Sequence, residues 1–395
     1  MTLMLEIVAV VVALPGLMTA VHLLTLALAS LAYRLPRDGT DVPPLRFLVM
    51  VPAHNEEPCI EHTLASISAS ARPRDTILVV ADCCTDRTAE LARAAGARVV
   101  ERRDDPGRAQ ARQAGLDHAR DLAWDAVLMV DADSTLEPGF MDACERALAG
   151  GARAGQARSE AAHGDRMIDQ AALAAFALQG ITIPRGRDRL GLLVRLRGTG
   201  MIIRRDVVER HRFSGAASED LRYSLDLCLD GVRPVHIEHA RLRSENAPNW
   251  GVAARQKERY EAGRTAAARD YIGRLLRRHD RASLEAALFL ASPPFATAVL
   301  SLVAGLGIGL LARSPLAVVL TTAGIAALAV SLVIALVESG ASARTWLALV
   351  IAPWYLAWKL LVQVRASLGV ARDKQSYGAT PRRASSQDRE PKVSS

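Results

Sequence analysis

The chain has 395 residues, enough for one large domain with attachments or for two ordinary domains. Half of the residues are hydrophobic, only 4% are aromatic, and the net charge is +7. Basic and aromatic residues are not interleaved along any stretch, so we expect no nucleic-acid partner. The five cysteines have no zinc-ligand spacing, which favours a reduced domain facing the cytosol.

The first 34 residues predict a membrane anchor. Leu3 to Ala32 is almost continuously apolar, and a hydrocarbon core of about 30 Å takes about 20 helical residues. A secretory signal peptide is the alternative, but no basic segment precedes the run, which is longer than a typical signal core. Tyr33, Arg34 and Arg37 follow, as expected at a cytoplasmic membrane edge. We therefore expect residues 1–34 to be an uncleaved transmembrane segment.

Strands and helices alternate after a proline-containing linker. Apolar runs predict strands at Phe47–Val51, Ile77–Val80, Ala97–Val100 and Val127–Val130. Helices are expected up to about Ser70, over Thr88–Ala95 and over Ala109–Leu122. This alternation predicts an α/β domain whose mostly parallel sheet carries helices on both faces. No Gly-x-Gly-x-x-Gly follows the first strand, which disfavours a dinucleotide-binding Rossmann domain.

The part up to residue 282 is less regular but completes the same domain, expected over residues 45–282. It predicts a helix over residues 166–179, a glycine-rich turn and strand over 197–203, a helix over Leu221–Asp230, a strand over Val235–Glu238 and a charged helix over 249–278. Gly231 follows the third of these as a C-terminal cap would.

Residues 284–366 predict a second membrane region. Two spans are expected at about 294–312 and 316–337, after an amphipathic lead-in at 284–292. A third apolar stretch at 346–364 contains Trp346, Trp354 and Lys359, which favours a helix lying in the membrane interface. A third span is the alternative, but it would put the basic tail outside, against the positive-inside rule. Residues 367–395 form that basic and polar tail.

Two acids, Asp131 and Asp133, follow the fourth expected strand. Ligands bind beyond the carboxyl ends of strands in open α/β sheets. Carboxylates this close repel each other unless a cation lies beside them, and Mg²⁺ is commonly held by one or two carboxylates plus phosphate oxygens. The alternative is that the acids cap the next helix, with Ser134 or Thr135 helping.

Five motifs occur in an order that resembles the membrane-bound family 2 glycosyltransferases, relatives of cellulose, chitin, hyaluronan and poly-N-acetylglucosamine synthases and of ceramide glucosyltransferase. They are Pro52-Ala-His-Asn-Glu-Glu57, Asp82, Asp131-Ala-Asp133, Ser218-Glu-Asp220 and Gln256-x-x-Arg259-Tyr260. The resemblance covers roughly residues 45–265. It implies a GT-A fold, a nucleotide-sugar donor that is most often UDP-linked, an Mg²⁺ or Mn²⁺ ion, and inversion at the anomeric carbon.

The resemblance also implies roles on the donor side. Metal binding falls to Asp133, with Asp131 beside it on the sugar or ribose, and the diphosphate to Arg259. The remaining donor-side residues are Pro52, Ala53, Glu56, Asp82, Arg108 and Gln256. Asp82 would contact the base or ribose, unless it only caps a helix together with Asp86. Gln256 and Arg259 share a helix face, so a merely solvated charged helix stays open. Relatives often carry Lys where this chain has Arg108.

The resemblance places catalysis at Glu219 and Asp220. Asp220 matches the base that takes the proton of the acceptor hydroxyl. An acid at a helix N-terminus is the alternative, and both can hold at once. Gly198, Thr199, Gly200 and Tyr260 are expected on the acceptor side. Relatives carry Trp at the last position, which puts stacking of the acceptor on Tyr260 in question.

These expectations lead to a metal-dependent transfer of sugar to a membrane lipid or a glycan, in glycolipid or exopolysaccharide synthesis. A processive synthase needs more spans than this chain offers, which favours a single transfer to a lipid, or completion by a partner membrane subunit. The expected place is the inner or plasma membrane, multi-pass, with the catalytic domain cytoplasmic. A nucleotidyltransferase and a non-catalytic membrane scaffold are the alternatives. The nucleotidyltransferase would need a glycine-rich basic loop after the first strand, which Pro52 to Glu57 does not provide.

Overall fold

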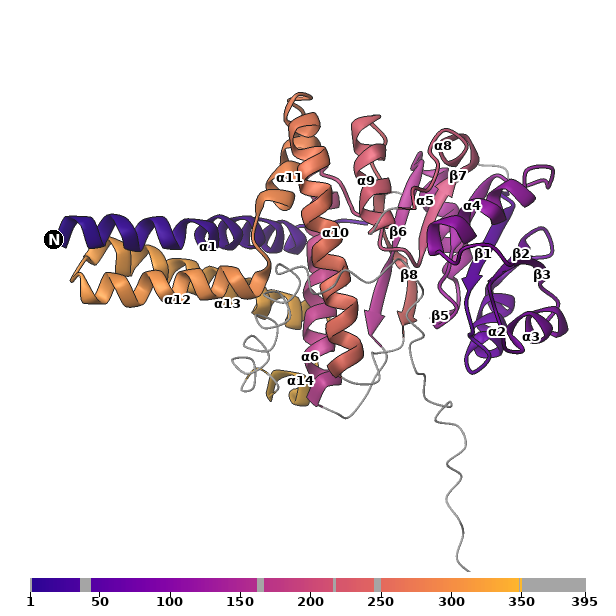
Figure 1. Ribbon diagram of the computed structural model, residues 1–395, viewed down its shortest axis with the longest axis horizontal. Helices are drawn as coiled ribbons and strands as arrows, with labels where there is room; N and C mark the ends of the chain where they lie inside the picture. The colour runs from indigo at the N-terminus through magenta and orange to yellow at the C-terminus, as the bar shows by residue number, and fades with distance from the viewer. Residues whose placement is uncertain are drawn as a thin grey trace, which may run out of the picture.

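The computed structural model describes residues 2–35, 44–161, 167–215, 218–244, 250–347 and 349. A sheet flanked by helices lies at one end of the molecule, and a bundle of apolar helices extends away from it (Figure 1). The long helix α10 (Trp250–Leu276) stands between the two parts. The expected α/β domain with apolar helices before and after it is confirmed.

The sheet has eight strands in the order β3-β2-β1-β4-β7-β6-β8-β5. Their bounds in chain order are β1 Phe47–Ala53, β2 Thr76–Asp82, β3 Arg98–Arg102, β4 Ala126–Met129, β5 Ser134–Leu136, β6 Ala154–Ala161, β7 Met201–Arg204 and β8 Val235–Ser244. Strands β1 to β4 pair in parallel, as expected, and so do β6 and β8. Strand β7 is antiparallel to β4 and β6, and β5 is antiparallel to β8.

Strands β5 and β6 were not expected from the sequence. Strand β6 reads Ala-Gly-Gln-Ala-Arg-Ser-Glu-Ala and contains no β-branched or aromatic residue, so strand propensity does not mark it. Its place is decided by pairing with β7 on one side and β8 on the other. The six successive residues from Ala154 to Ser159 are nevertheless all buried, as in a strand covered on both faces.

Two apolar cores lie on opposite faces of the sheet. In β1, Phe47, Val49 and Val51 face one core, and Leu48 and Met50 face the other, as the two-residue period of a strand requires. Helices α2 (Ile60–Ser70), α3 (Thr88–Ala94) and α5 (Phe140–Ala149) cover the first core. Helices α4 (Arg108–His118), α8 (Arg205–Val208) and α9 (Glu219–Leu229) cover the second.

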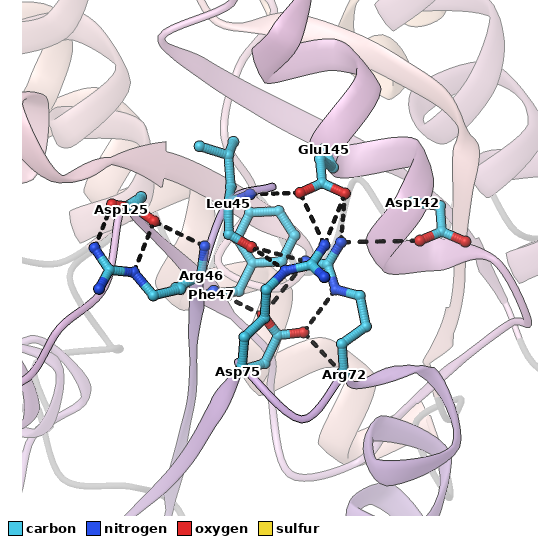
Figure 2. A network of polar contacts seen from close by, with 9 residues as sticks. Leu45, Arg46, Phe47, Arg72, Asp75, Asp125, Asp142 and Glu145 are labelled. Atoms are coloured by element: carbon cyan, nitrogen blue, oxygen red, sulfur yellow. Dashed lines mark hydrogen bonds and ion pairs between the residues drawn. The ribbon is translucent and has the colours of Figure 1, made fainter. Parts of the chain in front are cut away.

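A polar network closes the amino ends of the central strands (Figure 2). Asp75 is buried, and one of its oxygens accepts a hydrogen bond of 2.8 Å from the backbone nitrogen of Phe47. Arg72 donates to the other oxygen at 2.9 Å and to Glu145 at 2.6 Å, with its guanidinium over the Phe47 ring. These contacts hold one edge of the sheet together and leave the opposite edge, where the acidic motifs lie, for ligands.

The helix expected over residues 166–179 is interrupted. Helix α6 (Met167–Phe176) runs into a π-helical segment, η1 (Ala177–Thr182), and then into α7 (Ile183–Arg189). Segments of this kind are rare and frequently occur at functional sites. A Cβ at Gly180 would lie 2.3 Å from the carbonyl oxygen of Ser159, so this wide turn packs directly on the backbone of β6.

Two helices, α1 (Thr2–Leu31) and α13 (Pro315–Glu338), are long and apolar enough to cross a membrane. Helix α12 (Phe295–Leu311), at the expected span 294–312, has 17 residues and meets α11 (Arg281–Ala291) at a bend of 68°. That pair is a broken span or a re-entrant loop, and it makes up to three spans in the described part of the chain. A short helix, α14 (Ala343–Leu347), follows. Nearly all of the stretch 346–364, and the tail 367–395, lie outside the described residues.

Helix α1 lies alongside α12 and α13 (Figure 1). Small residues make this close packing possible, as is typical of helices in membranes. A Cβ at Gly16 would come within 2.5 Å of the carbonyl oxygen of Ala298 on α12, so a side chain there would force the helices apart. The N-terminal segment is therefore packed against the C-terminal apolar helices.

Candidate active site

The candidate site lies at the carboxyl ends of β1, β2 and β4. Strand β1 has β2 on one side and β4 on the other, so the strand order reverses at β1, and ligands of open α/β sheets bind at such a point. Ala53, Asp82 and Asp131 come at or just after the ends of these three strands. Parallel strands end at the same edge of a sheet, so motifs up to 78 positions apart in sequence meet there.

The turn after β1 is joined to the turn after β2. Pro52 and Ala53 are buried in β1, and the backbone nitrogen of Glu56 donates to Thr88 Oγ1 at 2.8 Å. The backbone nitrogen of Thr88 in turn donates to Asp86 at 3.0 Å. Asp86 therefore stabilises the start of α3 together with Thr88, a capping role that does not involve Asp82.

Asp82 is fully buried at the end of β2. Arg102 donates to one of its oxygens, and the backbone nitrogen of Gly107 donates to the other at 2.8 Å. Burial raises the pKa of the Asp82 carboxyl, although both of these bonds oppose the shift. Asp82 thus connects the second strand to the loop that opens α4, directly before Arg108.

Asp131 is joined to the glycine-rich turn through Thr199. The backbone nitrogen of Asp131 donates to Thr199 Oγ1 at 3.1 Å, and Ser134 Oγ lies 3.1 Å from the same oxygen. Ser134 begins β5, and α5 starts only at Phe140. The alternative in which Asp131 and Asp133 cap the next helix is therefore wrong, because a strand comes first. Thr199 thus supports the end of β4, and its expected place on the acceptor side stays a prediction.

Two arginines one turn apart on α4 face the acids. Arg108 Nη1 lies 3.5 Å from Asp131 Oδ2, and Arg112 Nη2 lies 3.7 Å from Asp131 Oδ1. Arg112 is fully buried and also donates to Glu219 Oε1 at 3.0 Å and to the carbonyl of Gly198 at 2.9 Å. Arg112 was not expected from the sequence. The signal that could have found it is its i+4 spacing from Arg108 on a helix that begins at the site.

The acids Glu219 and Asp220 open α9 directly after Ser218, which has the left-handed φ of 56°. Burial raises the pKa of Asp220, and the like charge of Glu219 raises it further. Gly198 has a φ of 86°, and a Cβ there would lie 3.3 Å from Arg112 Nη2 and 3.7 Å from Asp220 Oδ2. The positive φ and these neighbours both favour glycine at this position.

Helix α10 contributes unevenly to the site. Partial burial lowers the pKa of Arg259, as does the charge of Arg108, whereas the charges of Glu219 and Asp220 oppose the shift. The charges of Arg108, Glu219 and Asp220 therefore act on Arg259, although the side chains of both Arg259 and Gln256 are exposed. The hydroxyl of Tyr260 accepts a hydrogen bond of 3.2 Å from Arg195.

The residues present fit a divalent cation shared with phosphates. Among the described residues, no group of three or more His, Cys, Asp and Glu side chains could hold a metal by itself. Asp131 and Asp133 supply two carboxylates at the end of β4, and the remaining ligands of Mg²⁺ or Mn²⁺ would be phosphate oxygens. Arg108 and Arg112 add positive charge beside the same carboxylates.

Three comparisons bear on this geometry. The sequence model described as "Glycosyltransferase like family 2" matches residues 43–263, more than half of the chain. The 4,4'-diaponeurosporenoate glycosyltransferase of Staphylococcus aureus is 39% identical over 92 residues. That match covers 22% of this chain and about a quarter, 24%, of the relative's length.

The structure of mannosyltransferase PcManGT from Pyrobaculum calidifontis, in complex with GDP-Man and Mn²⁺, has the same fold. It superposes with a TM-score of 0.57 at 18% sequence identity, over 94% of this chain and 99% of that one. With the family match over residues 43–263, this decides between sugar transfer and the nucleotidyltransferase alternative: the chain belongs to the glycosyltransferase-like family 2 and is a glycosyltransferase of the GT-A type.

Proposed function

We propose that the protein transfers a sugar from a nucleotide-sugar, most often UDP-linked, to an acceptor at the membrane surface with inversion at the anomeric carbon. The observation that carries the proposal is the meeting of Asp131, Glu219 and Asp220 with Arg108 and Arg112 at the carboxyl edge of the sheet. Departure of a nucleoside diphosphate needs positive charge where negative charge develops, and these arginines supply it.

The donor side is assigned to the strand ends and helix α4. Asp133, with Asp131 beside it, would hold Mg²⁺ or Mn²⁺, and the ion when bound supplies a Lewis acid on the diphosphate. Arg108 and Arg259 bind the diphosphate, and Pro52, Ala53, Glu56, Asp82 and Gln256 are assigned to the nucleotide. The GDP-Man and Mn²⁺ in the Pyrobaculum mannosyltransferase support a donor of this kind.

Catalysis is assigned to Asp220. An inverting displacement needs a base on the face of the sugar opposite to the leaving group. Asp220 borders Gly198 at the site. Burial and the like charge of Glu219 raise the pKa of Asp220, which makes its carboxylate a stronger base. Glu219 is held by Arg112 and positions the first turn of α9. Gly198, Thr199, Gly200 and Tyr260 are assigned to the acceptor side.

The acceptor is assigned to the membrane. Helices α1 and α13, with α11 and α12, would hold the catalytic domain at the cytoplasmic face of the inner or plasma membrane as a multi-pass protein. Few spans favour a single transfer to a lipid over the extrusion of a growing glycan. The name of the Staphylococcus aureus relative, a glycosyltransferase of the carboxylate diaponeurosporenoate, supports an acceptor other than a growing glycan.

The test is to incubate the purified full chain with a panel of UDP- and GDP-sugars, a membrane lipid extract and Mg²⁺ or Mn²⁺, and to identify products by mass spectrometry. We expect one nucleotide-sugar to be consumed and one glycosylated lipid to form. Asp133→Ala and Asp220→Asn should each abolish product without lowering the unfolding temperature. The exposed Asp142→Asn serves as matched control. Undiminished product in both site variants would overturn these roles.

A further inference from the structure

Two arginines lead into the glycine-rich turn of the site. Arg195 and Arg197 stand on either side of Leu196, which is buried. Two hydrogen bonds fix the backbone of this segment. Leu196 N donates to Ser224 Oγ at 2.9 Å, and Arg197 N donates to Gln156 Oε1 at 2.9 Å. Arg197 directly precedes Gly198, so the two guanidiniums project from a fixed segment at the edge of the site.

Within the described ranges of the chain, neither guanidinium is paired with an acid. Among the described residues, no carboxylate lies within ion-pair distance of Arg195 or Arg197. Their partners are neutral: Arg195 donates to the Tyr260 hydroxyl at 3.2 Å, and Arg197 donates to the Gln179 carbonyl at 3.0 Å. The Nε atom of Arg195 is buried without a hydrogen-bond partner in the described part of the chain.

Neighbouring arginines show that this is not a general property of the region. Arg187 lies 2.6 Å from Glu285, and Arg264 lies 3.5 Å from Glu261. Arg195 and Arg197 are half-buried, and withdrawing charge from water without an opposite charge nearby is costly, so guanidiniums in such places are ordinarily paired. The positive charges of Arg195 and Arg197 are close enough that, after burial, Arg195 contributes to lowering the pKa of Arg197. Two unpaired positive charges this close together favour the binding of an anion.

Aromatic rings hold the two side chains in place. The Arg195 guanidinium lies 3.7 Å from the centroid of the Phe289 ring on α11, and the Arg197 guanidinium lies 5.4 Å from that of Phe176 on α6. A guanidinium on an aromatic face keeps its hydrogen-bonding edge available to an oxyanion. Phe289 lies on α11, which leads into α12, and α6 packs against α13, so both rings belong to elements next to the apolar helices.

A cavity of about 440 Å³ begins at Phe176. Its apolar wall is formed by α6 and the π-helical segment, through Leu173, Phe176, Ala177 and Ile181. The opposite wall is the segment 339–345 that follows the candidate membrane helix α13. The one acid in its lining, Glu160, is paired with Arg158 at 2.7 Å. The cavity is thus a partly apolar chamber beside the candidate membrane helix α13, with Arg344 in its lining and the Arg197 guanidinium over the ring of Phe176.

We propose that Arg195 and Arg197 bind the negatively charged head of an acidic lipid acceptor whose hydrocarbon chain lies in this cavity. Charge complementarity selects the head, and the apolar wall selects the chain. The head then lies next to Gly198, whose Cβ position is 3.7 Å from Asp220 Oδ2, and so reaches the proposed base. That the bound lipid is the acceptor rests on the proposed function. Binding of the lipid itself can be measured without any sugar transfer.

The test is equilibrium binding to the purified full chain in detergent with three probes: farnesyl phosphate, farnesol and inorganic phosphate. We expect farnesyl phosphate to bind at least about tenfold more tightly than either of the others, because only it satisfies both the cations and the cavity. Arg195→Gln and Arg197→Gln should each weaken farnesyl phosphate binding by about tenfold and leave farnesol and UDP binding unchanged. The exposed Arg212→Gln is the matched control and should change nothing.

The cavity is tested separately by Ala177→Phe, which fills it. Farnesyl phosphate and farnesol should both bind more weakly, while inorganic phosphate does not. Leu173→Trp is the second variant, and the unfolding temperature of each reports whether it folds. Unchanged farnesyl phosphate affinity in the two arginine variants, or in both filled variants, would overturn the assignment. If lipid binding is unchanged in these variants but sugar transfer proceeds, the proposed function stands and only the lipid site is refuted. If farnesyl phosphate binds specifically but no sugar is turned over, only the proposed function is refuted.

Discussion

Arg112 Nη1 lies 3.0 Å from Glu219 Oε1, which joins helix α4 to helix α9 across 107 positions of the chain. Through its other terminal nitrogen the same guanidinium reaches Gly198 and Asp131. One buried side chain therefore contacts the glycine-rich turn, the strand-end acid and the first turn of the helix that carries the proposed base. This makes Arg112 a positioning residue for the whole site.

Arg112→Gln should destabilise the fold by about 3 kcal/mol, because it leaves Glu219 and Asp131 without their buried cation. Combining it with Glu219→Gln should recover most of that loss but not the turnover, since Asp131 still lacks Arg112 and keeps only the more distant support of Arg108. Thermal unfolding and product formation are measured on both variants. A double variant no more stable than Arg112→Gln alone would show that the pair is not coupled.

The acid limb of the pH profile should reflect Asp220. A general base works only when deprotonated, so the raised pKa of Asp220 puts the rise of kcat/KM above the ordinary range of an aspartate. Glu219→Gln removes a like charge and should move the limb to lower pH. The measurement is kcat/KM against pH for both proteins. If the acid limb of the profile stays at the same pH in Glu219→Gln, Glu219 does not contribute to the raised pKa of Asp220.

Asp220→Asn should be more stable than the parent at neutral pH. A carboxyl whose pKa is raised on folding contributes stability below its unfolded pKa of about 3.9, and this is lost as pH rises through the folded pKa. The amide carries no charge, so the penalty disappears. Denaturant unfolding of parent and variant at pH 4 and pH 7.5 should show a gap that widens with pH. A constant gap would contradict the assignment.

Glu238→Gln should loosen the attachment of the sheet to the apolar helices. Glu238 on β8 accepts from Arg158 on β6 and from Arg185 on α7, and Arg185 also lies 3.4 Å from Glu338 of α13. Burial alone would raise the pKa of Glu238, but hydrogen bonds from His236 and Arg185 hold it well below the usual range. The stability from this group is therefore present above about pH 4.3 and is lost only in strong acid.

The expected cost of Glu238→Gln is about 3 kcal/mol at neutral pH, because two guanidiniums lose a buried partner. Proteolysis should then cleave more readily around α7, while UDP binding at the distant strand ends stays unchanged. Exposed Glu209→Gln, which breaks only a surface pair with Arg205, is the control. Equal protection in the two variants would show that the network does not hold the junction.

Local patterns in the sequence were sufficient for much of this protein. Runs of apolar, β-branched residues predicted β1 to β4, because strands buried on both faces need them. Long apolar segments predicted the helices now seen at α1 and α13, since their composition alone distinguishes them. The order of the acidic motifs predicted the fold and the enzyme class, which the family match confirms.

Only the tertiary structure decided which side chains meet. Strand β6 lacks any propensity signal and exists because β7 and β8 flank it, and the π-helical turn at Ala177–Thr182 depends on packing against β6. Arg112, Arg195 and Arg197 are unremarkable in an arginine-rich sequence, because their importance lies in contacts with residues far away in the chain. Local propensity is a property of neighbours in sequence, whereas a site is made by neighbours in space.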